Sequence, residues 1–217
     1  MAAAWKHFKD GGWGMYVILF WSILTVGVIV ERALYLYGAS INKEVFLATM
    51  QKCILAGDIA KAVKMCSAAN APLARIVQAG LVKVNRPDEE VQAAMDESAL
   101  REVPRIAKRT GYLALLANLS MLSGLLGTVS GLIVSFGAVS GESVDPSQKA
   151  RILAEGISEA MNCTAFGLIV AIIGLVAFAV LNGKTQSLED DINEASVQVL
   201  NLVVTNRQKV SLAGLAG

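Results

Sequence analysis

The stretch LALLANLSMLSGLLGTVSGLIVSF (113–136) is followed, after a short polar segment, by GISEAMNCTAFGLIVAIIGLVAFAVLNG (156–183). The first stretch lies in a charge-free interval that begins after Arg109, and most of the second lies in one that begins after Glu159. A helix needs about 20 apolar residues to cross a hydrocarbon core of about 30 Å. Each interval is therefore long enough to span a membrane as a helix.

A third charge-free interval covers residues 11–30, between Asp10 and Glu31. None of the three shows the strict alternation of barrel strands, so helices are the structures expected to satisfy the backbone in lipid. The composition agrees, because 54% of the 217 residues are hydrophobic, only 17% are charged, and the mean hydropathy is +0.54. The sequence predicts an all-α integral membrane protein with three transmembrane helices, over 14–36, 110–139 and 157–183.

Other classes of protein find little support in the composition. The net charge of +1 argues against nucleic-acid binding, which normally requires a basic excess. Three widely spaced cysteines and the single histidine His7 suggest neither a disulfide framework nor a metal site. We therefore expect no nucleic-acid partner and no metal or other cofactor.

The basic residues predict the orientation of the chain in the membrane. Eleven Lys and Arg residues lie in 38–110, and four of them closely precede the second span. By the positive-inside rule this segment and the C-terminal tail are cytoplasmic, and the N-terminus is outside. The apolar run of the first span is too long for a typical signal peptide, so we expect the span to be retained.

The charged segment between the first two spans has a helical pattern. Apolar residues recur at three- and four-residue spacing over 44–69, with a break at Gly57-Asp58. Pro72 starts a short apolar helix, and Pro87-Asp88 starts a longer one that is expected to form a continuous helical stalk into the second span. The tail 185–210 is amphipathic, and helix packing is the simplest role for all these segments.

Small residues form stripes on the second and third spans. Small residues allow helices to approach closely in lipid, so these stripes predict helix packing, although such patterns alone are common. The predicted packing positions are Gly124, Gly127 and Gly131 in the second span, and Gly167 and Gly174 in the third.

The geometry of the hairpin places two threonines at one depth. The connection between the second and third spans is centred near Pro146, and Thr128 and Thr164 each lie 18 residues from it. Glu159 is five residues nearer the centre than Thr164, which corresponds to about 7–8 Å along a helix. An ionisable residue within a membrane suggests an ion pathway or a paired structural acid.

The two hairpin stretches resemble the signature of the MotA/TolQ/ExbB proton channel family. The stretch GDIAKAVKMCSAANAPLARIVQAGL (57–81) and the Glu31-Arg32 pair after the first span are also similar to the ExbB/TolQ branch. MotA-type proteins usually have four spans, and three spans favour the ExbB/TolQ type. Two prolines common in the family hairpin are replaced here, so helix bending can differ.

The resemblance implies a homopentamer around a dimer of a separate ExbD/TolR-like single-span protein, in the bacterial inner membrane. Such complexes use the proton motive force to work on envelope machinery, and the proton is the transported ion. Carried over by motif, Thr128 and Thr164 would line the pore and Glu159 would be the channel glutamate. The partner supplies the critical aspartate, and lipids surround the complex.

The combined expectation divides the chain into seven segments. In order, they are a periplasmic or interfacial N-terminal segment (1–13), the first span (14–36), a cytoplasmic helical domain (37–109), the second span (110–139), a periplasmic loop (140–156), the third span (157–183) and a cytoplasmic C-terminal helix (184–217).

Two other classes of function compete with the channel. A non-conducting membrane scaffold would explain the glycine stripes and the amphipathic helices, but not the common depth of two threonines beside an acid. An intramembrane enzyme would need a nucleophile–base pair or two carboxylates, and the spans supply neither. The sequence does not identify which envelope machine is driven.

Overall fold

The computed structural model describes residues 12–140 and 145–206, which are helical apart from short connections and contain no strand. The chain divides into two compact units. We call Met1–Arg32 with Arg109–Val180 the membrane unit, and Ala33–Lys108 with Leu181–Gly217 the charged unit. The predicted all-α fold is confirmed, and the outermost part of the predicted N-terminal segment lies outside the described residues.

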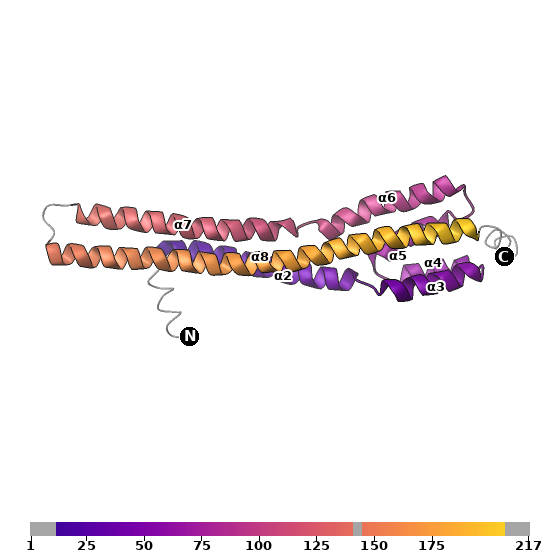
Figure 1. Ribbon diagram of the computed structural model, residues 1–217, viewed down its shortest axis with the longest axis horizontal. Helices are drawn as coiled ribbons and strands as arrows, with labels where there is room; N and C mark the ends of the chain where they lie inside the picture. The colour runs from indigo at the N-terminus through magenta and orange to yellow at the C-terminus, as the bar shows by residue number, and fades with distance from the viewer. Residues whose placement is uncertain (1–11, 141–144, 207–217) are drawn as a thin grey trace. The chain divides into compact units, whose positions relative to one another are not determined.

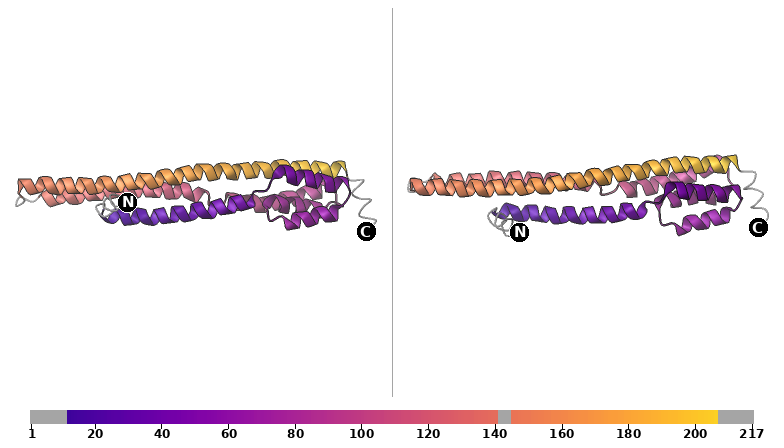
Figure 2. Two further views of the ribbon diagram at one scale, coloured as in Figure 1. Left: turned by 90° about the horizontal axis from the view of Figure 1, so that it is seen from below. Right: turned by 60° about the horizontal axis from the view of Figure 1, so that its bottom comes forward.

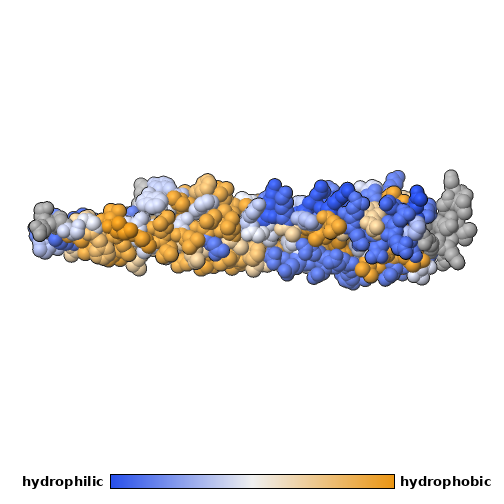
Figure 3. All heavy atoms as spheres, turned by 90° about the horizontal axis from the view of Figure 1, so that it is seen from above, coloured by the Kyte–Doolittle hydropathy of each residue, from blue (hydrophilic) through white to orange (hydrophobic). Residues whose placement is uncertain are grey.

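Within the described residues, three helices contribute to the membrane unit: α2 (Gly12–Ala39), α7 (Gly111–Val139) and α8 (Pro146–Thr205). Each contains a segment long and apolar enough to cross a membrane. Figures 1 and 2 show α7 and α8 side by side as an antiparallel pair. Large apolar side chains such as Phe20, Ile133 and Ile172 are more than half exposed, and Figure 3 shows hydrophobic residues gathered over this unit. In lipid, such surfaces need no further cover.

Helix α8 begins at Pro146, inside the predicted loop over 140–156, and residues 141–144 of that loop lie outside the described residues. Proline suits the first turn of a helix, where its missing N–H would have no intrahelical partner. The same helix continues without a break from the third span into the C-terminal segment. The third span and the predicted C-terminal helix, as far as Thr205, are thus parts of one helix, and residues 207–217 lie outside the described residues.

The charged unit contains four further helices: α3 (Lys43–Leu55), α4 (Ile59–Ala68), α5 (Pro72–Val82) and α6 (Asp88–Ala107). Asn42 and Asp58 cap α3 and α4, each accepting a hydrogen bond from the backbone N–H three residues later. Gly57 joins these two helices with a φ of +75°, which glycine adopts without strain. The predicted break at Gly57-Asp58 is confirmed.

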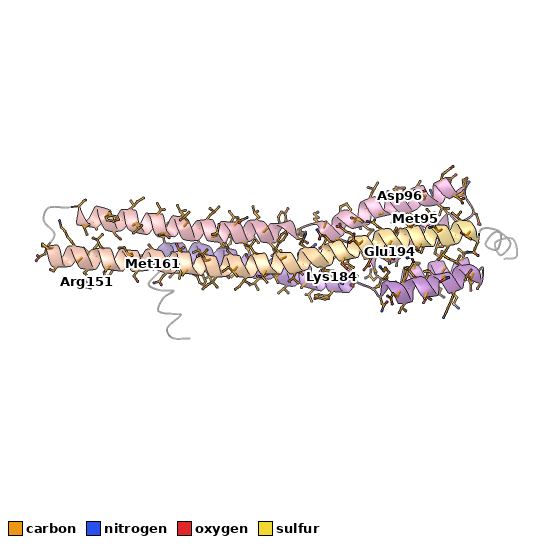
Figure 4. The ribbon with its side chains drawn as sticks, in the orientation of Figure 1. Met95, Asp96, Arg151, Met161, Lys184 and Glu194 are labelled. Carbon is orange, nitrogen blue, oxygen red and sulfur yellow. The ribbon has the colours of Figure 1, made fainter. Side chains whose placement is uncertain are left out.

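Apolar side chains form the core of the charged unit. The helix α5 packs against α4 and α6, and its residues Ile76 and Val77 are fully buried. Met95 of α6, labelled in Figure 4, lies so close to Gly80 that a Cβ there would come within 2.5 Å of Met95 Cγ. Gly80 thus allows α5 and α6 to pack closely.

The C-terminal part of α8 carries an apolar stripe within the charged unit. Leu188, Ile192 and Val199 are buried, as the amphipathic pattern predicts. Lys43, at the start of α3, donates to Asp191 Oδ1 at 2.8 Å and to Glu194 Oε2 at 2.7 Å. These two carboxylates raise the pKa of Lys43 above its ordinary value. The ion pairs therefore join α3 to α8.

The predicted continuous stalk into the second span is wrong at one point. Helix α6 ends at Ala107 and α7 begins at Gly111, so the chain leaves the helical path between them. Arg109 has a φ of +72°, a left-handed conformation that interrupts an α-helix. Pro104 lies inside α6, less than one turn before the helix ends.

Candidate functional site

Two threonine hydroxyls meet between α7 and α8. Thr128 Oγ1 and Thr164 Oγ1 are in hydrogen-bond contact, and either can be the donor. The two residues thus lie at the same level along the paired helices, and their common depth in a membrane stays a prediction. Both threonines are half-buried within the chain.

The hydroxyl pair has more acceptors than protons. The Gly124 carbonyl oxygen lies 3.1 Å from Thr128 Oγ1 and 3.2 Å from Thr164 Oγ1, and the Ala160 carbonyl oxygen lies 3.4 Å from Thr128 Oγ1. Each hydroxyl has one proton to donate and lone pairs that accept. When one threonine donates to the other, the second donates to a carbonyl, and the direction can reverse. Such a pair can pass a proton or bind water.

The glycine stripes bring the backbones of α7 and α8 together around this pair. A Cβ at Gly167 would lie 2.8 Å from the Ser120 carbonyl oxygen, and one at Gly124 would lie 3.2 Å from the Cys163 carbonyl oxygen. The remaining predicted packing positions are also closely approached by side chains, with Gly127 against Cys163, Gly131 against Ala160, and Gly174 against Ala117 and Thr25. Helix packing at these positions is therefore observed.

Glu159 lies on a different side of α8 from Thr164, beside the N-terminus of α2. A Cβ built on Gly12, the first residue of α2, would overlap the Glu159 carboxyl group. Gly12 also has a φ of +63°, which disfavours any larger residue. The first N–H groups of a helix lack intrahelical acceptors and favour a nearby negative charge. The structure thus places this acid beside α2 and does not bring it into the threonine pair.

The Glu159 side chain lines a cavity of about 170 Å³ between the three membrane helices. Cys163, one turn along α8, also lines this cavity, as do the α7 residues Ser130 and Ser135. Both serine hydroxyls donate to carbonyls of their own helix, at 3.1 Å and 2.8 Å, and keep lone pairs for water. A polar cavity of this size can hold several water molecules. The acid therefore lies beside a polar space that can hold water molecules.

Sequence reasoning did not find the part that α2 plays in this site. Trp21 of α2 donates through Nε1 to Ser123 Oγ of α7 at 3.1 Å. Gly14 of α2 lies against both Cys163 Sγ and the Gly127 backbone. The small residues Gly12 and Gly14 were the available signal, although two glycines near a helix start are a weak one.

Comparison with known proteins shows which family and which proteins this chain is similar to. The model of the MotA/TolQ/ExbB proton channel family matches residues 68–194. The biopolymer transport protein ExbB-like 1 of Synechocystis sp. is 32% identical over 181 residues, covering 81% of this chain and 69% of its own length. The Tol-Pal system protein TolQ of Haemophilus influenzae is 36% identical over 98 residues, covering 45% of this chain and 42% of its own length.

The long apolar helices, with a polar pair between α7 and α8, define an all-α membrane protein. The chain belongs to the MotA/TolQ/ExbB proton channel family, whose model matches more than half of its length. This family consists of channel and energy-transduction proteins rather than enzymes.

Proposed function

We propose that the chain is the proton-channel and stator subunit of a bacterial inner-membrane motor. It would couple the proton motive force to mechanical work on envelope machinery. The observation that carries this proposal is the hydroxyl contact between Thr128 and Thr164 in the α7–α8 pair. These threonines would line the conduction path, and Glu159 would accept and release the transported proton. No cofactor is required.

The proposed complex is a homopentamer around an ExbD/TolR-like dimer. The large apolar side chains exposed on the membrane unit can be covered by lipid, whereas its polar groups gain from protein neighbours. The partner would supply an ionisable group from its single span. The biopolymer transport names of several relatives and the Tol-Pal name of another support a role in such a system.

Proton flux into liposomes that contain this chain and its partner tests the pore assignment. We expect Thr128→Val and Thr164→Val each to abolish partner-dependent flux, because valine keeps the volume and removes the hydroxyl. Thr128→Ser and Thr164→Ser keep the hydroxyl and are expected to retain most of the flux. Full flux in both valine variants would contradict the assignment.

The acid is tested in the same assay. Glu159→Gln keeps the shape of the side chain, removes its titratable charge and should severely reduce flux. Glu155→Gln is the matched control, because Glu155 is exposed and bonds only to Arg151 one turn away among the contacts of the described residues. Equal effects of the two substitutions would contradict a special role for Glu159.

A non-conducting scaffold is the second candidate function. The close packing at Gly124 and Gly167, together with the threonine bonds to helix carbonyls, is what a purely structural hairpin would also need. A scaffold predicts that the valine variants act by loosening the complex. Size-exclusion chromatography of the same variants separates the candidates, because the channel predicts intact complexes without flux.

A further inference from the structure

The charged unit contains a cavity of about 500 Å³ between α5 and α6. Pockets that bind small molecules commonly have volumes of about 300–1,000 Å³. Four cationic and two anionic side chains line this one, which gives it a net positive charge. The cationic residues are Arg75, Lys83, Arg101 and Arg105, and the anionic residues are Glu97 and Glu102.

Glu102 fixes two of the arginines in place. Its carboxylate is almost fully buried and accepts from Arg75 Nη2 at 2.6 Å and from Arg105 Nη1 at 3.2 Å. Arg75 keeps further donors, because its side chain is 39% exposed and, among the contacts of the described residues, only Nη2 of its guanidinium bonds to Glu102. A phosphate oxygen in the cavity would accept from these donors in a charge-assisted hydrogen bond.

Lys83 supplies a second available cation at the same cavity. Its side chain is exposed at the end of α5, and it forms no ion pair with a carboxylate of the described residues. Arg101 bonds to Glu97 at 2.5 Å on the exposed surface of α6, an interaction that a stronger anion can replace. Lysine and arginine together are the usual ligands of phosphate oxygens.

Part of the cavity wall is apolar. Ala79 and Val82 of α5 and Ala94 of α6 line it beside the cations. A ligand that fills the space would therefore combine an anionic group with a less polar body. None of the described residues that line the cavity is aromatic, so the wall offers no ring on which a base could stack.

We propose that this cavity binds a soluble phosphate-bearing ligand of nucleotide size. Lys83 and the guanidinium of Arg75 hold the phosphate, Arg101 adds a third cation, and Val82 contacts the ligand body. Because stacking is lacking, purine and pyrimidine nucleotides bind alike. This proposal is independent of the channel function, since the site uses residues of the charged unit alone.

Calorimetric titration of the full chain in phosphatidylcholine nanodiscs tests the proposal, with ATP, UTP and adenosine as probes. We expect saturable binding of ATP and UTP with similar affinity, and none of adenosine. Lys83→Gln should weaken ATP binding about tenfold, because it removes one charge-assisted contact. Lys83→Arg keeps the positive charge and should bind ATP as the wild type does. Lys64→Gln changes an exposed lysine of α4 outside the cavity and should leave ATP binding unchanged.

In the phosphatidylcholine nanodiscs, the proposal would be overturned by no saturable ATP binding, by equal binding of adenosine, or by equal effects of the two glutamine substitutions. A second set of nanodiscs contains phosphatidylglycerol. Undiminished ATP binding there supports a soluble ligand, whereas loss by competition would overturn it in favour of a lipid headgroup. These measurements need neither proton flux nor the partner protein, so their failure leaves the channel proposal standing.

Discussion

At the scale of single residues, Gly12 controls the position of the proposed channel acid. The Glu159 carboxyl occupies the space that a Cβ on Gly12 would need, and the positive φ of Gly12 adds a second obstacle. We expect Gly12→Ala to displace the carboxyl group and to reduce proton flux at least tenfold without preventing assembly. Liposome flux and native mass spectrometry check the two parts. Gly27→Ala, at an open position on α2, should leave flux unchanged.

Cys66 provides a pH-dependent prediction in the charged unit. Burial, with a smaller effect of Cys53, raises the pKa of Cys66 to about 11 from an ordinary value of 9.0. Between these values the unfolded chain loses the proton while the folded chain keeps it, so folding stability falls as pH rises. Denaturant titrations from pH 8 to 11 should show a steeper loss of stability in the wild type than in Cys66→Ala. Parallel curves of stability against pH for the two proteins would contradict this prediction.

At the scale of elements, the α7–α8 contact depends on Gly167. A Cβ there would meet the Ser120 carbonyl oxygen at 2.8 Å and Gly124 Cα at 3.1 Å, and backbone atoms cannot move aside easily. Gly167→Ala should therefore cost about 1–3 kcal/mol of stability. Thermal melting in detergent measures this cost. Gly137→Ala, which meets no atom within 4 Å, serves as the control and should melt like the wild type.

The elements also show which features the sequence could predict. Charge-free length and proline positions located α7 and the starts of α5 and α6, because membrane crossing and helix initiation are local requirements. The interruption at Arg109 has no such signal, since arginine is a good helix former and only the surrounding structure holds it at a φ of +72°.

The candidate site likewise contains one contact that the sequence could predict and one that it could not. Counting residues from Pro146 was sufficient to pair Thr128 with Thr164, because an antiparallel hairpin fixes their depth. The approach of α2 to Glu159 could not be predicted by counting residues, since residues 40–110 separate α2 from the hairpin. Contacts between distant segments depend on packing that no local pattern encodes.

At the scale of the whole molecule, cysteine labelling tests the topology. The native residues Cys53, Cys66 and Cys163 are all buried, so a cysteine introduced at an exposed position should dominate the reaction with a membrane-impermeant thiol reagent. Ser147 and Gln186 are both exposed, and they lie on either side of the apolar part of α8. Because basic residues favour the cytoplasmic side, Ser147→Cys should react in intact spheroplasts and Gln186→Cys only after lysis. Labelling of Gln186→Cys in intact spheroplasts, with protection of Ser147→Cys, would reverse the orientation of the chain.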